Sequence, residues 1–177
     1  LMKEPPRKST ESLFSRGGLE CTVFYGFLIA IISLTAFLKL PVSLLAHGGK
    51  ELTIENLAMV LSDVKILAHC QTYAFTVLGL SQLFHAVGMR NVGKSVFRMR
   101  HLENKLMVAA VVAGVFLQVM VTEIPQLVAV FQTAALTGRE WGELLILAAA
   151  PMAAHELLIF LSKLHKPKDY QDDSAVF

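Results

Sequence analysis

Residues 21–38 read CTVFYGFLIAIISLTAFL, and no charged side chain occurs between Glu20 and Lys39. A helix rises about 1.5 Å per residue, so a run of this length comes close to crossing a hydrocarbon core of about 30 Å. The apolar residues are continuous rather than alternating, which favours a membrane helix over a strand of a membrane barrel. We therefore predict a membrane-spanning helix in this stretch.

Three further stretches are predicted to span the membrane for the same reason. They cover residues 66–89, 106–122 and 141–162, and most charged residues lie between them. The last stretch is the least hydrophobic, because it holds Glu143, Pro151 and Glu156. The predicted fold is all-α: a polytopic membrane protein with a four-transmembrane-helix bundle.

The composition supports this fold class and excludes others. Apolar residues make up 54% and charged residues 17% of the 177 residues, against roughly 25% charged in soluble proteins. A chain this apolar is neither a soluble globule nor a disordered segment. The net charge of +2 gives no basic surface, so we expect the lipid bilayer and not nucleic acid as a partner. Cys21 and Cys70 are too few for a disulfide framework or a four-ligand zinc site.

Lysine and arginine predict the orientation. The ends of the chain and the segment 90–105 hold 12 of these residues, and the two other connections hold 4. Both termini and the segment 90–105 should therefore be cytoplasmic. The predicted organisation is a cytoplasmic arm at 1–20, a four-helix transmembrane domain at 21–162 and a cytoplasmic tail at 163–177.

Small residues recur four apart on the third and fourth predicted spans. The pairs are Ala109 with Ala113, Ala110 with Gly114, Ala149 with Ala153, and Ala150 with Ala154. Such spacing lets two membrane helices approach closely. It predicts contact between these two spans, although alanine-rich helices also produce such pairs by chance.

Polar residues inside the spans are candidates for a functional site. Ser81, Gln82 and His85 are the candidates for a polar lining or a cation site, and inter-helix hydrogen bonding is the alternative that we favour. Calcium prefers six to eight oxygen ligands, and Glu156 is the one carboxylate well inside a span. We therefore expect no complete metal site in this chain. The sequence also lacks phosphate-loop, dinucleotide, zinc-protease and serine-hydrolase motifs, so we expect no catalytic residue and no bound cofactor.

Two stretches are more specific. Residues 1–15 read LMKEPPRKSTESLFS, and residues 72–91 read TYAFTVLGLSQLFHAVGMRN. They resemble the C-terminal membrane domain of type 2 P-type cation ATPases, the calcium-transporting ones above all. The first resembles the cytoplasmic loop between the sixth and seventh helices of that family, and the second resembles its eighth helix. The resemblance covers about residues 1–163.

The resemblance implies a function for a larger assembly. Pumps of this family hydrolyse ATP, with Mg²⁺, through a phosphorylated aspartate in a DKTGT motif, and export a cation such as Ca²⁺. That motif is absent from this sequence. The chain thus resembles the last four helices of a pump, cut after the sixth, and should be inactive alone. Its implied partners are the first six helices and the cytoplasmic domains, in the plasma membrane.

The resemblance also assigns roles to particular residues. Gln82 aligns with a position where the two-site pumps carry a glutamate that binds calcium. A neutral amide is a weaker ligand for a hard cation, so we expect Gln82 to serve in packing. In the arm, Pro5 and Pro6 would stiffen the chain, while Arg7 and Lys8 would dock on the phosphorylation domain.

Two other functions stay open on the sequence. The chain could be an independent four-helix adaptor or regulatory subunit, which would be stable alone and bind a partner through the arm or the segment 90–105. It could also be a non-functional remnant of a pump. A pump scaffold should instead associate with the upstream helices.

Overall fold

The computed structural model describes residues 18–88 and 105–165 of the chain. These residues form helices connected by short turns. The helices are α1 (Gly18–His47), α2 (Ile54–Leu61), α3 (Val64–Gly88), α4 (Lys105–Glu123), α5 (Pro125–Phe131), α6 (Gly138–Ala148) and α7 (Ala150–His165). The predicted all-α class is confirmed.

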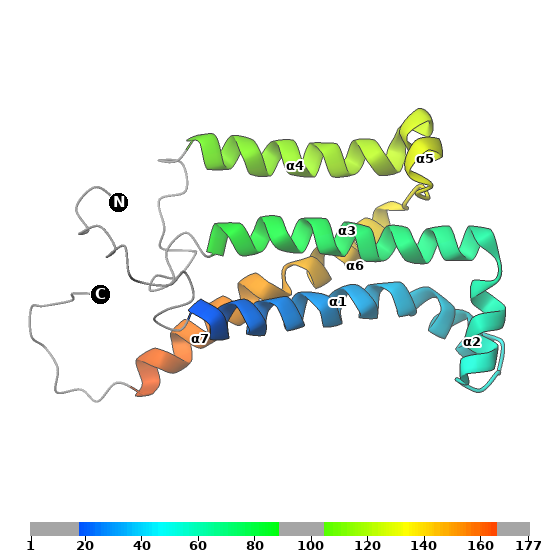
Figure 1. Ribbon diagram of the computed structural model, residues 1–177, viewed down its shortest axis with the longest axis horizontal. Coiled ribbons are helices and arrows are strands. Elements are labelled where there is room, and N and C mark those ends of the chain that lie inside the picture. The colour runs from blue at the N-terminus through cyan, green and yellow to red at the C-terminus, as the bar shows by residue number, and fades with distance from the viewer. Residues whose placement is uncertain (1–17, 89–104, 166–177) are drawn as a thin grey trace, which may run out of the picture.

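The long helices lie roughly side by side (Figure 1). Helix α3 runs between α1 and α4, and it also contacts α6 and α7. The beginnings of α1 and α4 and the ends of α3 and α7 lie at one end of the bundle, on the left in Figure 1. The short helices α2 and α5 lie at the opposite end. We call these the α1-start end and the α2–α5 end.

Helix boundaries differ from the predicted spans at Lys39 and near Pro151. Helix α1 continues past Lys39 to His47, and the Lys39 ammonium pairs with Glu143 on α6. The span predicted at 141–162 is divided into α6 and α7 at Ala149. Pro151 follows at once, and its ring nitrogen has no hydrogen to donate to the carbonyl group four residues earlier.

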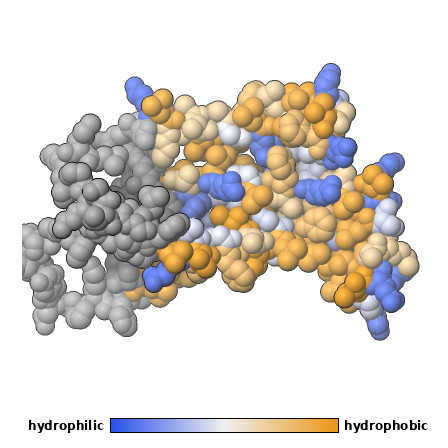
Figure 2. All heavy atoms as spheres, in the orientation of Figure 1, coloured by the Kyte–Doolittle hydropathy of each residue, from blue (hydrophilic) through white to orange (hydrophobic). Residues whose placement is uncertain are grey.

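Three of the described helical stretches are long and apolar enough to cross a membrane: Leu19–His47, Lys105–Glu123 and Gly138–Leu161. Helix α3 is long too, with 25 residues, but it is more polar, so the fourth crossing stays a prediction. Apolar side chains dominate the face in Figure 2, and hydrophilic ones interrupt it along the line of α3. The most polar of the long helices thus keeps part of its surface uncovered by the other described helices.

The core lies where α1, α3 and α6 meet. Ile32 and Ala36 of α1 pack with Tyr73 and Val77 of α3 and with Leu144 of α6. Ala36 is fully buried, and its small side chain lets α1 approach α3 closely.

Helix α4 packs on α3 and α5, and its extensive contacts among the described residues are with these two. The predicted close packing of 106–122 on 141–162 is therefore wrong. The small residues that matter are Gly114 and Gly79, at the contact of α4 with α3. A Cβ atom on Gly114 would lie 2.7 Å from Leu83 Cδ1, and one on Gly79 would lie 3.0 Å from Gln118 Oε1. The sequence could not show this pairing, because every span carries small residues.

Candidate functional site

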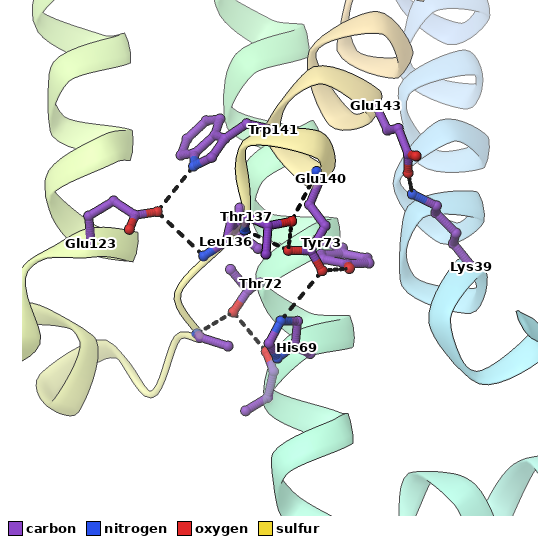
Figure 3. Close-up of polar contacts among 12 residues, drawn as sticks. Lys39, His69, Thr72, Tyr73, Glu123, Leu136, Thr137, Glu140, Trp141 and Glu143 are labelled. Carbon is purple, nitrogen blue, oxygen red and sulfur yellow. Dashed lines mark hydrogen bonds and ion pairs between the residues drawn. The ribbon is translucent and has the colours of Figure 1, made fainter. Parts of the chain in front are cut away.

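A polar network closes the α2–α5 end of the bundle, centred on Glu140 at the start of α6 (Figure 3). Thr137 is the N-cap residue: its side chain accepts a hydrogen bond from Glu140 N, and its own N–H donates to Glu140 Oε2 at 2.6 Å. The Tyr73 hydroxyl donates to Glu140 Oε1 from α3. His69 Nε2 lies 3.7 Å from the same oxygen. One carboxylate therefore both caps α6 and attaches it to α3.

A second carboxylate, that of Glu123 at the end of α4, binds the segment that connects α5 to α6. Its Oε1 accepts hydrogen bonds from the Trp141 indole at 3.1 Å and from Leu136 N at 3.4 Å. Nearby, Ala134 N donates to Thr72 Oγ1 of α3 at 2.8 Å (Figure 3). These bonds satisfy backbone groups of a segment that has no helix of its own.

The third carboxylate, Glu143, pairs with Lys39 of α1 and with Arg139 one turn earlier on α6. The three carboxylates of this network, Glu123, Glu140 and Glu143, thus have donors within the described residues. In the same part of the chain, no cluster of three or more His, Cys, Asp or Glu residues is arranged to hold a metal ion. The network joins α6 to α1, α3 and α4 through the side chains of Lys39, Tyr73 and Glu123.

The three candidates from the sequence lie in different surroundings. Ser81 is buried and donates to Leu78 O at 3.0 Å. Gln82 is exposed. His85 is half-buried, and its ring lies 4.3 Å from the ring of Tyr25 on α1. The three residues lie within four positions of one another on α3, but Ser81 bonds to the backbone of its own helix, Gln82 is exposed and His85 contacts α1.

Gln82 belongs instead to an exposed stripe along α3. The stripe residues are Gln71, Phe75, Leu78, Gln82 and Ala86. Their spacing of three and four places them on one side of a helix. At the α2–α5 end the stripe borders a pocket of about 200 Å³, lined by Gln71, Thr72, Phe75, Phe131, Gln132 and Thr133. The sequence placed Gln82 and Gln71 in the span, but it could not show that the described helices leave both uncovered.

The side of α3 that packs on α4 holds a buried polar pair. Gln118 of α4 is 8% exposed, and its amide nitrogen donates to the buried Thr76 Oγ1 at 3.0 Å. This is the inter-helix hydrogen bonding expected for glutamine in a membrane bundle. On the side of α3 that faces α4, the polar group of Thr76 has a partner on another helix, whereas the glutamines of the stripe are exposed.

A family model described as "Cation transporting ATPase, C-terminus" matches residues 1–161. The chain belongs to this family. The match covers α1 to α6 and most of α7, and it agrees with the resemblance that the arm and the 72–91 stretch indicated.

Two curated relatives of this ATPase C-terminal region carry calcium in their names. "Calcium-transporting ATPase 1" of Bacillus cereus is 36% identical over 167 residues, which is 92% of this chain and 18% of that protein. "Calcium-transporting ATPase" of Bacillus subtilis is 30% identical over 151 residues, which is 85% of this chain and 15% of that protein. The chain thus spans less than a fifth of the length of either relative.

The arm of the ATPase C-terminal region cannot be placed on this framework. Pro5, Pro6, Arg7 and Lys8 lie outside the described residues. Their docking on a phosphorylation domain stays a prediction. The candidate functional surface that the structure describes is therefore the exposed stripe of α3.

Proposed function

We propose that this chain is the C-terminal transmembrane scaffold of a P-type calcium-transporting ATPase. It supports ATP-driven export of Ca²⁺ by the whole pump and supplies no catalytic residue. ATP, Mg²⁺ and Ca²⁺ are substrates or cofactors of the whole pump, and the other part of that pump is the partner. The family match and the names of both relatives support this function.

The exposed stripe of α3 carries the proposal. The carboxamides of Gln71 and Gln82 each offer two donors and an acceptor, and a lipid chain can satisfy none of them. A helix with this stripe therefore needs a protein neighbour. Since the chain matches 18% of the length of a pump, the remaining helices of that pump are the neighbour that we infer.

In this function Gln82 packs against an upstream helix and does not bind the transported ion. The scaffold lies in the plasma membrane with both termini in the cytoplasm. There Pro5 and Pro6 stiffen the arm, and Arg7 and Lys8 dock it on the phosphorylation domain.

Assembly from two polypeptides tests the scaffold function. The chain is expressed with the upstream portion of a relative's pump, which carries an affinity tag, and calcium-dependent ATP hydrolysis is measured on the purified complex. We expect the chain to be recovered with the tagged portion and to be required for activity. A chain that is stable but never recovered would contradict the scaffold function and favour an adaptor.

Matched variants test the surface. Leu78→Trp on the stripe should reduce recovery of the complex, whereas Val112→Trp, on an exposed position of α4 that is 62% accessible, should not. Gln82→Ala should retain calcium-dependent hydrolysis within about threefold, since loss of one polar contact in a membrane interface costs about 0.6 kcal/mol. Loss of all activity in Gln82→Ala would contradict the packing role.

A further inference from the structure

Charged residues on two of the long helices mark where a hydrocarbon core fits on the bundle. Glu20 and Lys39 of α1 are 19 residues apart, and Lys105 and Glu123 at the two ends of α4 are 18 residues apart. At about 1.5 Å per residue, each pair is separated by about 27–29 Å, which matches a hydrocarbon core of about 30 Å. Lys39 and Glu123 therefore lie at the boundary of the core on the side of the α2–α5 end.

Helix α2 lies well beyond that boundary. Helix α1 continues for eight residues after Lys39, to His47. Helix α3 begins at Val64, nine residues before Tyr73, and the Lys39 ammonium lies over the Tyr73 ring. Two helices thus each place α2 about 12 Å outside the core. Since the headgroup layer adds only about 5–8 Å on each side of a bilayer, α2 is surrounded by water and not by lipid.

Large apolar side chains are nevertheless exposed on and beside α2. Leu52, Ile54, Met59 and Val64 have exposed fractions of 65%, 88%, 60% and 78%. These four lie within thirteen consecutive residues, and no residue of α2 is buried. We call them the α2 patch. Apolar side chains that gather on a surface outside the membrane indicate a site for a protein partner.

The rest of this chain does not supply a cover for the α2 patch. The stretches outside the described residues adjoin α1, α3, α4 and α7 at the α1-start end of the bundle (Figure 1). They would have to cross the bilayer to reach α2. The cover therefore has to come from a polypeptide segment outside this sequence.

We propose that the α2 patch binds a loop of the upstream portion of the pump, on the same side of the membrane. The proposal rests on the proposed function, in which that portion covers the stripe of α3. Val64 lies seven residues before Gln71, which is about two helical turns, so both residues lie on the same side of α3. The neighbour that covers the stripe is therefore next to the patch. It holds the chain at two depths, inside the bilayer through the stripe and beyond the bilayer through the patch.

The residues around the α2 patch describe the loop that it binds. The exposed charges beside it have both signs, from Lys50 and Lys65 and from Glu51, Glu55 and Asp63. No strong field of one sign results, so the contact should depend on apolar side chains at its centre and on polar groups at its rim. The loop should thus present apolar residues to Ile54 and its neighbours.

Fluorescent labels on single cysteines test the proposal. Ile54→Cys and, as the control on α5, Gln126→Cys are prepared without Cys21 and Cys70 and placed in lipid nanodiscs. In the isolated chain, iodide in the water should quench both labels strongly, and lipids that carry a nitroxide on an acyl chain should quench them weakly. After assembly with the tagged upstream portion, iodide quenching should fall several-fold at position 54 and stay unchanged at position 126.

The outcomes separate this inference from the proposed function. Strong quenching at position 54 by the nitroxide lipids would overturn the inference, because α2 would then lie on the membrane surface. A recovered, active complex in which position 54 is as accessible as before would also overturn it and would leave the proposed function intact. Failure to recover any complex would contradict both.

A charge on the α2 patch gives a second test. Ile54→Glu should weaken the apparent affinity for the upstream portion about tenfold or more, because burial of an isoleucine side chain contributes at least that factor. Gln126→Glu adds the same charge on α5 and should have no such effect. Since Ile54 is largely exposed, Ile54→Glu should leave the thermal unfolding of the isolated chain unchanged. Equal affinities of the two variants would contradict the α2 patch as a binding surface.

Discussion

At the scale of the residue, the glycines of α3 and α4 set how closely these helices approach. Gly114 has Leu83 against it, whereas Gly26 on α1 has open space where a Cβ would lie. Both glycines are in helices, so the loss of helix propensity is the same for both. They therefore form a matched pair that separates packing from propensity.

Gly114→Val should destabilise the bundle by about 1–3 kcal/mol, since the added methyl groups force Leu83 and the helix backbone to move. Gly26→Val should have a much smaller effect. Thermal loss of helical circular dichroism in detergent measures both. Equal effects of the two variants would show that α4 does not pack on α3 through Gly114.

The hydrogen bond between Gln118 and Thr76 should be coupled energetically. In a double-mutant cycle with Gln118→Leu and Thr76→Val, we expect a coupling energy of about 0.6 kcal/mol and no more than about 2 kcal/mol. Unfolding in denaturing detergent measures the four proteins of the cycle. A coupling of zero would mean that each group finds other partners.

At the scale of the element, α6 depends on its first turn. Glu140 caps the helix together with Thr137 and also accepts from Tyr73 on α3. Glu143 lies one turn later and forms ion pairs near the surface with Lys39 and Arg139. Exposed ion pairs contribute little, because water screens them and their long side chains lose freedom.

Glu140→Gln should therefore cost about 1–3 kcal/mol of stability, because it weakens the cap and leaves a buried partner poorly satisfied. Glu143→Gln should cost clearly less. The thermal midpoints of the two variants in detergent give the comparison. If Glu143→Gln were the more destabilising, the ion pairs and not the cap would hold α6 in place.

The sequence predicted the positions of the helices better than it predicted where they end and which helices pack together. Runs without charged residues located α1, α3 and α4, because a membrane-spanning helix requires about 20 consecutive, mostly apolar residues. Pro151 was noticed, yet the break that precedes it was not predicted, because prolines also occur inside intact membrane helices. The Tyr25–His155 contact joins residues 130 positions apart, and no local pattern encodes such a pairing.

At the scale of the whole molecule, the question is which surface faces protein and which faces lipid. Exposure alone cannot decide, since large apolar side chains are exposed on all the long helices, including Phe27 of α1 and Phe116 of α4. The glutamines of the α3 stripe distinguish it from those lipid-compatible surfaces. The candidate site could therefore be predicted from the sequence only in part. The sequence identified Gln82 as a candidate, but only the structure shows that it lies in an exposed stripe along α3.

Single cysteines test this assignment in a background without Cys21 and Cys70. Gln82→Cys and Val112→Cys should react with a maleimide reagent at similar rates in the isolated chain in detergent. After assembly with the upstream portion of the pump, the rate at position 82 should fall several-fold while that at position 112 does not change. Protection at both positions, or at neither, would contradict the stripe as the covered surface.

Two prolines give the bundle a mechanical property. Pro41 lies inside α1 and Pro151 near the start of α7, and both are fully buried. Pro41 removes one backbone hydrogen bond from the interior of α1, and Pro151, in the first turn of α7, has no N–H to donate to the carbonyl group of Leu147 in α6. A helix bends most easily where a backbone hydrogen bond is missing. When neighbouring helices move against the bundle, we expect α1 to bend at Pro41 and the α6–α7 pair to bend near Pro151. Helices α3 and α4 contain no proline and should move as rigid units.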